Sequence, residues 1–483
     1  MKKILFVTSE VFPLIKTGGL ADVSGSLPIA LKALGHDVRI LVPGYPKVLA
    51  SAAFRELATY PENAPRLMEA TLPGSNVPVW AMRDETHFGR EGNPYLGADG
   101  APWPDNGERF AHFCRVSVEI ALDRLGLDFK PDVVHCNDWQ TGLIPALLAD
   151  EPKRPASVFT IHNLAYQGVF PRSTFDALKL PTRFWSPEAL EFYDQLSFIK
   201  GGLVFSDRIS TVSPTYAREI QEKAEGCGLD GLLSHRSDRL SGILNGIDTE
   251  AWNPATDPLI DPHFDVKRLK NRAQSKAYLQ RVSGLPEDAS IPVLTWVGRL
   301  VEQKGIDFLL ESLPKLMALP LQIILIGTGD VRYEKTLRDW QHLFPERLSV
   351  YLGYDEARAH QAEAGADLFL MPSRFEPCGL NQMYSQRYGA VPLVRRAGGL
   401  ADTVIDATPE ALEAGTATGI IFDEATSEAF FEAVERALSL YGQKRLWQNI
   451  QKNGMQKDFA WETSARQYLD LYDAALGDLR SSK

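Results

Sequence analysis

Short runs of β-branched and other apolar residues recur along the chain, and each run is followed by a turn rich in Gly or Asn and then by a helical pattern. In the first half these runs are residues 4–7, 38–42, 133–134, 158–161 and 209–212. In the second half they are residues 293–297, 321–326, 348–352, 368–371 and 391–394. Buried strands that alternate with helices are typical of parallel sheets covered on both faces. The pattern therefore predicts an α/β protein with two doubly wound, Rossmann-like domains.

The junction between the two halves is predicted in a polar stretch that contains proline, from Asn245 to about Pro262. We expect an N-terminal domain over residues 1–245 and a C-terminal domain over residues 246–455. Aromatic residues at helical spacing predict a last helix within residues 456–483, which crosses back to the first domain. A chain of 483 residues exceeds what one hydrophobic core usually supports. Two domains that face a central cleft would provide a natural site for a small molecule.

Composition narrows the class of partner. The net charge of −11 disfavours nucleic acid or an anionic membrane surface. Lys2 and Lys3 precede an apolar run, as in a signal peptide, but the run is short and Glu10 follows, so a first buried strand is predicted instead. The four cysteines show no CxxC or metal-ligand spacing. We therefore expect a cytoplasmic protein without a metal site.

The segment Pro372–Gln382, with the sequence PSRFEPCGLNQ, is the most informative part of the chain. It follows the predicted strand 368–371 and leads into a helix predicted to begin at about Asn381. In open parallel sheets, ligands bind at the carboxyl ends of the strands. A carboxylate there, beside backbone N–H groups at a helix start, suits a sugar hydroxyl and a neighbouring phosphate. Glu376 is therefore the central candidate residue.

Two further segments are candidates for phosphate binding. Lys16–Asp22 (KTGGLAD) follows the first predicted strand, and its glycines would let a phosphate approach the backbone at a helix start. It matches neither GxGxxG nor a Walker loop, and a plain tight turn explains it equally well. The sequence recurs as Arg396–Asp402 (RAGGLAD), either as a second glycine-lined loop or as an unrelated turn. Arg299 and Lys304 follow the strand 293–297 and could neutralise a diphosphate leaving group without a metal, although a solvated basic pair is the alternative.

Polar and aromatic residues also follow two strands of the first half. His135–Trp139 (HCNDW) and His162–Gly168 (HNLAYQG) each end a short predicted strand. A His and an Asp at strand ends, with Trp139 and Tyr166 close in sequence, would form a sugar pocket with polar edges and aromatic faces. A histidine in such a position is as often structural as catalytic. No nearby spacing supports a metal site at either histidine.

Taken together, these segments resemble the bacterial glycogen synthases and plant starch synthases. The resemblance rests on six segments in matching order, namely Lys16–Asp22, His162–Gly168, Asn245–Asp248, Arg299–Lys304, Ser373–Leu380 and Gly398–Thr403. It implies a two-domain fold of the GT-B type, with the nucleotide-sugar donor mainly on the second domain and the glucan acceptor mainly on the first. It also implies transfer of glucose from ADP-glucose to the non-reducing end of an α-1,4-glucan, with retention of configuration. No metal and no other cofactor are expected.

The resemblance further implies a role for each matching residue. Arg299 and Lys304 would hold the diphosphate, Glu376 would contact the transferred glucose, and His162 would lie at the reacting face. The implied substrate-binding residues are Lys16, Gly18 and Gly19 for the distal phosphate; Cys378, Gly379 and Leu380 for backbone contacts near glucose and phosphate; Asp138, Trp139 and Asn245 for the glucose pocket; Tyr354 near the adenine; and Asp22 on the acceptor side.

The chain departs from the family pattern in places. Asn381 stands where the family often has Thr, which removes a possible hydroxyl contact. The wider retaining superfamily often carries a second Glu eight positions after the first, where this chain has Tyr384, so a mechanism with two carboxylates cannot be inferred. Two alternatives remain open: another retaining GT-B enzyme that uses a UDP- or GDP-sugar, or a non-catalytic carbohydrate-binding scaffold.

Overall fold

The computed structural model describes residues 1–59, 65–97 and 99–481. They form two compact units, unit 1 with Met1–Gly246 and the C-terminal segment from Trp461, and unit 2 with Ile247–Ala460. The last helix, α18 (Trp461–Ser481), lies within the predicted range 456–483. Residues 459–460 stay with unit 2 because Ile247 and Ala460 form a β-bridge and the Ile247 N–H donates to the Phe459 carbonyl at 2.8 Å.

Unit 1 is built on a nine-stranded sheet with the order β12-β11-β7-β6-β1-β2-β5-β4-β3. Its strands are β1 (Lys3–Val7), β2 (Asp37–Pro43), β3 (Arg55–Thr59), β4 (Arg66–Thr71), β5 (Pro78–Arg83), β6 (Val133–Asn137), β7 (Ala156–Ile161), β11 (Arg208–Thr211) and β12 (Leu240–Gly242). All neighbours pair in parallel except β3 with β4 and β4 with β5. A separate antiparallel sheet, in the order β8-β10-β9, contains β8 (Val169–Pro171), β9 (Glu191–Phe192) and β10 (Gln195–Ser197).

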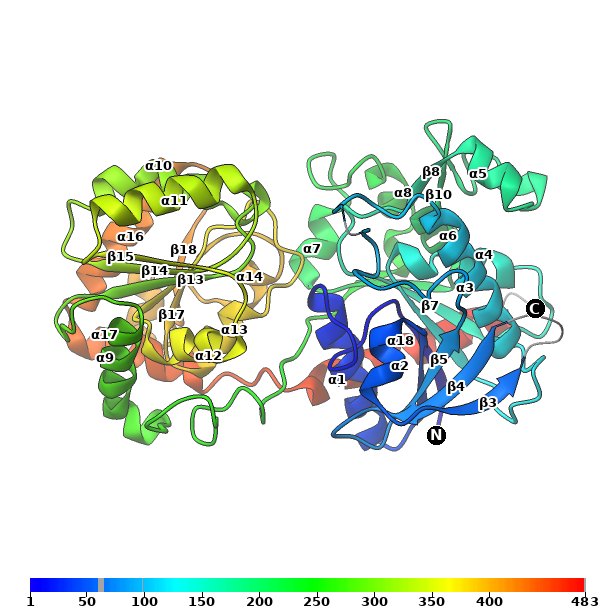
Figure 1. The fold of residues 1–483 in the computed structure, drawn as a ribbon, viewed down its shortest axis with the longest axis horizontal. Helices are drawn as coiled ribbons and strands as arrows, with labels where there is room; N and C mark the ends of the chain where they lie inside the picture. The colour runs from blue at the N-terminus through cyan, green and yellow to red at the C-terminus, as the bar shows by residue number, and fades with distance from the viewer. Residues whose placement is uncertain (60–64, 98, 482–483) are drawn as a thin grey trace. The chain divides into compact units, whose positions relative to one another are not determined.

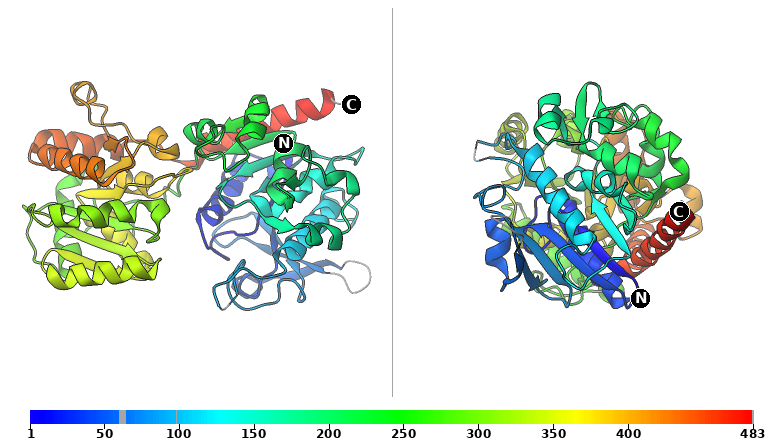
Figure 2. Two further views of the ribbon diagram at one scale, coloured as in Figure 1. Left: turned by 90° about the horizontal axis from the view of Figure 1, so that it is seen from above. Right: turned by 90° about the vertical axis from the view of Figure 1, so that its right-hand side faces the viewer.

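Helices pack around the two sheets of unit 1. They are α1 (Gly19–Ala33), α2 (Pro46–Ser51), α3 (Asn106–Ala121), α4 (Leu143–Leu148), α5 (Arg172–Ala177), α6 (Phe198–Phe205), α7 (Pro214–Glu219), α8 (Asp230–His235) and α18. Tyr468 and Tyr472 of α18 lie fully buried in one core cluster with Ile4 and Phe6 of β1 and with Val158 of β7. The chain therefore returns to unit 1 at its end, and Figures 1 and 2 show both termini on this unit.

Unit 2 contains a six-stranded parallel sheet with the order β15-β14-β13-β16-β17-β18. Its strands are β13 (Val293–Val297), β14 (Gln322–Gly327), β15 (Leu348–Leu352), β16 (Leu368–Met371), β17 (Val391–Arg395) and β18 (Ile420–Phe422). Its helices are α9 (Arg272–Val282), α10 (Ile306–Leu316), α11 (Val331–Leu343), α12 (Glu356–Gly365), α13 (Asn381–Arg387), α14 (Gly398–Thr403), α15 (Pro409–Glu413), α16 (Ser427–Tyr441) and α17 (Lys444–Met455). Figure 1 shows α10 and α11 on one face of the sheet and α12 and α13 on the other.

Alternating side chains of the unit 2 strands pack into different cores, as a sheet buried on both faces requires. Leu294 and Trp296 of β13 belong to the core beneath α10 and α16, whereas Val293 packs with Leu279 of α9 and Ala362 of α12. This double burial explains why the strands read as continuous apolar runs. The predicted α/β class with two doubly wound sheets is confirmed, and every apolar run predicted as a strand overlaps one.

The polar stretch predicted as the junction is packed onto unit 2 from Ile247 onward. Trp252 stacks between His360, at 3.7 Å between ring centroids, and Tyr384, at 3.8 Å. Asp257 accepts a hydrogen bond from the Tyr388 hydroxyl at 2.6 Å and pairs with His360 at 2.7 Å. Tyr384, at the position where the superfamily often has a second Glu, therefore has a packing role.

Within the part of the chain that the structure describes, no helix combines the length and the apolar character needed to cross a membrane.

Candidate functional site

Both sheets have a topological switch point, where consecutive connections leave in opposite directions along the sheet. In unit 2 it lies between β13 and β16, and in unit 1 between β1 and β6. Ligands of doubly wound sheets bind outside the carboxyl ends of the strands at such points. The segments with Arg299 and Lys304 follow β13, and the segment with Glu376 follows β16.

Lys304 and Glu376 are in direct contact at the switch point of unit 2. The Lys304 Nζ donates to Glu376 Oε2 at 2.5 Å, and the Ser373 hydroxyl donates to the same oxygen at 2.9 Å. The Glu376 side chain is 7% exposed and that of Lys304 is 24% exposed. The carboxylate is thus anchored from inside the protein, and its partner cation remains accessible to solvent.

Three glycines let the surrounding loops approach the Glu376 segment. A Cβ on Gly305, which has a φ of 75°, would lie 2.1 Å from the Pro372 carbonyl oxygen. A Cβ on Gly398, with a φ of 42°, would lie 1.9 Å from the Glu376 carbonyl oxygen, to which the Gly399 N–H donates at 3.2 Å. The repeated glycine motif of the second half therefore supports the Glu376 loop from behind.

Arg299 reaches this group through an intermediate residue. Its guanidinium is exposed and donates to the Gln303 side-chain oxygen at 3.3 Å. The Gln303 side chain in turn donates from Nε2 to the Phe375 carbonyl at 3.3 Å, and its backbone carbonyl accepts the Arg374 N–H at 2.8 Å. Gln303 was not predicted from the sequence, because nothing in its immediate neighbourhood marks a glutamine as the link between two loops.

The residues after Glu376 form the turn that begins α13. Cys378 is buried, and Gly379 has a φ of 71°, with space for a Cβ occupied by the Gln382 side chain at 2.5 Å. Leu380 is the N-cap residue of α13. Asn381 donates from Nδ2 to the Val297 carbonyl at 2.8 Å, so it ties the helix start to the end of β13.

Tyr354 lies apart from this group along the sheet, after the edge strand β15. Its side chain is 68% exposed, and its hydroxyl donates to Glu356. The aromatic face is thus accessible, and its contact with a nucleotide base stays a prediction.

In unit 1 the Lys16–Asp22 loop is organised by a residue that sequence reasoning missed. The buried carboxylate of Glu10 accepts the Thr17 N–H at 2.5 Å, the Thr17 hydroxyl at 2.6 Å and the Tyr95 hydroxyl at 2.5 Å. It also accepts the Gly18 N–H at 3.3 Å. The Gly18 N–H is therefore directed toward Glu10 rather than outward, which leaves the Gly19 end of the helix for a ligand. Glu10 is not recognisable from sequence because Tyr95 lies 85 residues away.

The outer side of the same loop is open. A Cβ on Gly18 or on Gly19 would meet no atom within 4 Å, and the φ of Gly18 is −156°. Neither packing nor backbone conformation therefore requires a glycine here. Lys16 forms an ion pair with Asp22 at 2.8 Å, with side chains 39% and 21% exposed. The loop has the space for a group that must come close to the backbone.

His162 and Asp138 form a buried polar pair after β7 and β6. The backbone N–H of His162 donates to Asp138 Oδ1 at 2.7 Å, and the ring nitrogen Nε2 of His162 forms a hydrogen bond with Asn137 Oδ1 at 2.9 Å. Since Asn137 donates from Nδ2 to the Val7 carbonyl, its oxygen accepts from His162, and the assigned tautomer carries its proton on Nε2.

Burial sets the charge of this pair. It lowers the pKa of His162 to about 3, so the imidazole is neutral near pH 7. Burial also raises the pKa of Asp138 to about 7, although the backbone N–H groups of His162 and Asn163 favour the ionised form. The pair can exchange hydrogen bonds with an uncharged hydroxyl without bringing a full positive charge to it.

The other predicted residues of unit 1 differ in environment. His135 is fully buried and hydrogen-bonds the Tyr472 hydroxyl of α18 at 2.8 Å and the Thr160 hydroxyl at 2.6 Å, which accounts for it structurally. Trp139 is partly exposed and packs edge-on against Phe110, with 5.1 Å between ring centroids. The buried Asn245 Oδ1 has no hydrogen-bond partner among the residues that the structure describes.

Comparisons with known proteins agree with this arrangement. Residues 3–235 match the family model described as a starch synthase catalytic domain, and residues 281–457 match that of the glycosyl transferases group 1. The chain is 58% identical to glycogen synthase 1 of Methylococcus capsulatus, over 99% of this chain and 98% of that protein. It is 52% identical to glycogen synthase 2 of Nitrosococcus oceani, over 100% and 99%.

Solved structures lead to the same family. The catalytic domain of starch synthase IV from Arabidopsis thaliana, bound to ADP and acarbose, superimposes with a TM-score of 0.89 at 32% identity and covers 99% of both chains. Sucrose-phosphate synthase from Thermosynechococcus elongatus shares the fold, with a TM-score of 0.60 at 16% identity over 98% of both chains. With two doubly wound units of the GT-B type and relatives of this identity along its whole length, the chain belongs to the glycogen and starch synthase family of glycosyltransferases.

Proposed function

We propose that the chain is an ADP-glucose-dependent glycogen synthase, which transfers glucose to the non-reducing end of an α-1,4-glucan with retention of anomeric configuration. The observation that carries this proposal is the Lys304–Glu376 pair at the switch point of unit 2. It combines an accessible cation, suited to a diphosphate, with an anchored carboxylate, suited to sugar hydroxyls. The ADP and acarbose bound to the similar starch synthase IV support both ligand classes.

The chemical step begins with departure of ADP. An ammonium has three donors, so Lys304 can keep its bond to Glu376 and still contact a phosphate oxygen. The exposed Arg299 guanidinium presents a planar fork to the diphosphate. Together the two cations stabilise the negative charge that develops on the leaving group.

The glucosyl group then carries positive, oxocarbenium-like character. Glu376 Oε2 already accepts two hydrogen bonds, which leaves Oε1 for a glucose hydroxyl. The acceptor hydroxyl attacks from the face that ADP leaves, and its proton goes to the departing phosphate. No general base of the protein is assigned, because the ring N–H of His162 is donated to Asn137 and the remaining nitrogen, Nδ1, serves to accept a hydrogen bond from a sugar hydroxyl.

Unit 1 contributes uncharged hydrogen-bonding groups for glucose and a loop whose backbone a phosphate can approach closely. The Gly18–Gly19 loop, with Lys16 beside it, offers space for a phosphate. Asp138, Trp139 and Asn245 provide hydrogen-bonding groups and an aromatic edge for glucose.

The same proposal has consequences for cofactors, partners and cellular compartment. Two cations neutralise the diphosphate, so transfer proceeds without a divalent metal or another cofactor. The partners are ADP-glucose and a glucan or maltooligosaccharide, in the cytoplasm, and the charge of −11 argues against nucleic acid and membrane surfaces as partners.

A donor screen tests the proposal. The protein is incubated with a maltooligosaccharide and ADP-, UDP- or GDP-glucose, and product lengths and rates are measured. Stacking on an aromatic ring contributes roughly 1–3 kcal/mol per base, or about five- to 150-fold in affinity. We expect ADP-glucose to exceed UDP-glucose by at least about tenfold in kcat/KM. Equal use of both would contradict the ADP-glucose assignment, and no turnover with any donor would indicate a binding scaffold.

A further inference from the structure

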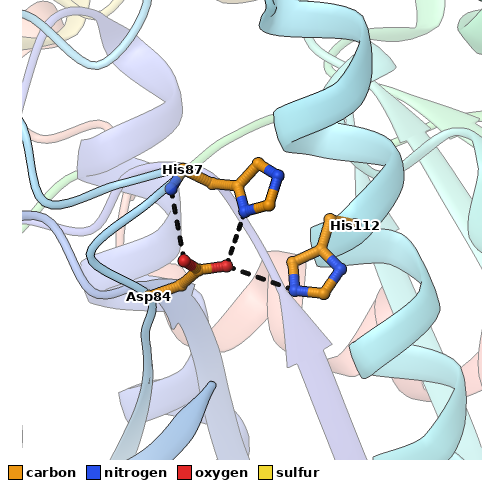
Figure 3. A group of neighbouring side chains, drawn as sticks. All are labelled: Asp84, His87 and His112. Carbon is orange, nitrogen blue, oxygen red and sulfur yellow. Dashed lines mark hydrogen bonds and ion pairs between the residues drawn. The ribbon is translucent and has the colours of Figure 1, made fainter. Parts of the chain in front are cut away.

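A cluster of two histidines and one aspartate lies in unit 1, away from both switch-point loops in the sequence. Asp84 directly follows β5, His87 lies in the next turn, and His112 projects from α3 (Figure 3). Their side-chain ligand atoms all lie within 4.8 Å of one another. Among the residues that the structure describes, this is the only such grouping of His, Cys, Asp and Glu.

The Asp84 carboxylate contacts both imidazole rings (Figure 3). Asp84 Oδ2 lies 2.7 Å from His87 Nδ1 and 3.2 Å from His112 Nε2. The two imidazole rings stack at 4.7 Å between centroids, with 26° between their planes. Ligands at about 2.0–2.1 Å from a tetrahedral or octahedral ion lie roughly 3.0–3.4 Å apart. The Asp84–His112 distance lies in this range and the Asp84–His87 distance is a few tenths of an ångström shorter, while the two ring nitrogens lie within 4.8 Å of each other, so small side-chain rotations would be needed to surround an ion.

The surrounding hydrogen bonds hold the donors in this orientation. The second oxygen of Asp84, Oδ1, accepts the Thr86 N–H at 2.9 Å and the His87 N–H at 3.2 Å, so Oδ2 is directed to the two rings. Arg109, one helical turn before His112 on α3, donates from Nε to the His87 carbonyl at 2.6 Å. Such outer contacts orient ligands in known metal sites.

We propose that Asp84, His87 and His112 form a binding site for a divalent transition metal ion, with Zn²⁺ as the expected occupant. Two imidazole nitrogens and one carboxylate oxygen suit Zn²⁺, Ni²⁺ and Co²⁺, whereas Mg²⁺ and Ca²⁺ prefer oxygen ligands. Three protein ligands leave one or more positions for water. The Asp84, His87 and His112 side chains are 10%, 27% and 31% exposed, so an ion can reach the site.

The ion would link the turn after β5 to helix α3. Residues 84 and 112 enclose a segment that includes Tyr95, whose hydroxyl contacts Glu10, and Pro94, whose carbonyl accepts from Arg109 at 3.1 Å. The site would thus stabilise the segment that positions Glu10. None of the three ligands is part of the machinery proposed for glucosyl transfer, and the inference does not depend on that function.

The expectation of no metal site rested on the spacing of the cysteines and on the sequence neighbours of His135 and His162. The ligands here are an Asp and a His three positions apart, and a second His on a helix much farther along the chain. Only the fold places His112 of α3 beside Asp84, in the turn after β5.

Metal titration of the full-length protein tests the site. A Cys227→Ser background removes an exposed thiol that could bind zinc independently. After chelator treatment and dialysis, Zn²⁺ is titrated in competition with a chromophoric chelator, and Co²⁺ is followed by its visible absorption. The expected result is one ion per chain. Loss of outer contacts alone weakens metal sites roughly 10–100-fold, so His112→Ala and Asp84→Asn should each weaken binding at least about tenfold.

His342→Ala is the matched control, because His342 is an exposed helical histidine of unit 2. It should bind metal like the background protein. Circular dichroism and the glucosyl transfer rate establish that each variant is folded, and Zn²⁺ should raise the melting temperature of the background protein but not of His112→Ala. Absence of Zn²⁺, Ni²⁺ and Co²⁺ binding to the background protein, or unchanged affinity in folded His112→Ala and Asp84→Asn, would overturn the proposal.

Discussion

Substitution of Lys304 by Ala separates the electrostatic role of this residue from its structural role. The change removes the accessible cation and leaves Glu376 with Ser373 as its remaining hydrogen-bond donor. We expect kcat to fall by a factor of roughly a hundred or more, since groups that stabilise transition-state charge contribute on that scale. Glu376→Ala should cause a loss of similar size.

The stability change is smaller and can be estimated from exposure. Breaking a fully buried ion pair destabilises a protein by about 3–5 kcal/mol, whereas exposed pairs contribute about 0–1 kcal/mol. With Glu376 at 7% and Lys304 at 24% exposure, an intermediate value of about 1–3 kcal/mol is expected. Each kcal/mol lowers the melting temperature of a domain of this size by about 2–4 °C. The variant therefore stays folded at assay temperature.

The assay compares kcat, KM and melting temperature for both variants, the double variant and a matched control. Lys315→Ala is that control, because Lys315 pairs with Glu428 at 2.6 Å in the same unit but with side chains 52% and 64% exposed. It should change neither kcat nor stability appreciably. If Lys304 and Glu376 act as a unit, the double variant should lose about as much as the worse single variant. A kcat within tenfold of the parent in folded Lys304→Ala, or an equal loss in Lys315→Ala, would refute the reasoning.

The remaining predictions address other parts of the site. Gly18→Ala and Gly19→Ala should leave the melting temperature unchanged and raise KM for the donor. Gly398→Ala should lower the melting temperature, because its Cβ would lie 1.9 Å from the Glu376 carbonyl oxygen. The same response of all three variants in calorimetry and kinetics would contradict this distinction. Asp138→Asn should flatten the pH dependence of stability between about pH 4 and about pH 7. Burial raises the pKa of Asp138 from 3.8 to about 7, so its contribution to the stability of the folded state is fully present at low pH and is lost as the pH rises through about 7. This contribution is at most roughly 4 kcal/mol. If parent and variant show the same pH dependence of the melting temperature, the raised pKa of Asp138 is excluded. Tyr354→Ala should narrow the preference for ADP-glucose over UDP-glucose, as measured by kcat/KM with each donor, and an unchanged ratio would remove Tyr354 from the base site. EDTA should leave transfer intact in a standard turnover assay, and a loss of activity restored by magnesium or manganese would show that the two cations do not suffice.

The sequence reveals most of the parallel strands because they are buried on both faces, although the parallel-paired β5, β12 and β18 were not predicted. Residues 4–7 and 368–371 are apolar throughout and fully buried, so their hydropathy alone predicts them. In contrast, only two of the six residues of β4 are buried and the strand includes Arg66 and Glu69, and β9 has two residues. These antiparallel elements carry no continuous apolar signal, and none of them was predicted.

The sequence identifies candidate site residues more readily than it tells a functional residue from a structural one. His135 and His162 both end predicted strands, and their sequence pattern alone does not separate them; only the family resemblance singled out His162. His135 is bound to Tyr472, which lies 337 residues later, whereas His162 contacts the adjacent strand end at Asn137. The distinction depends on where α18 packs, and hydrophobic periodicity does not specify that contact.

The two units use the same topology for different electrostatic tasks. At the switch point of unit 2 stand an exposed guanidinium at Arg299 and an accessible ammonium at Lys304. At that of unit 1, burial keeps His162 neutral and favours the protonated form of Asp138 up to a pH of about 7. A diphosphate needs compensating positive charge, whereas sugar hydroxyls need donors and acceptors without net charge. The repeated glycine motif follows the same division, because Gly398 supports the Glu376 loop while Gly18 and Gly19 leave open space. Similar sequence and similar topology therefore do not imply equal roles. Substitutions in the glycine motif of unit 2 should reduce stability, whereas those in the motif of unit 1 should weaken ligand binding.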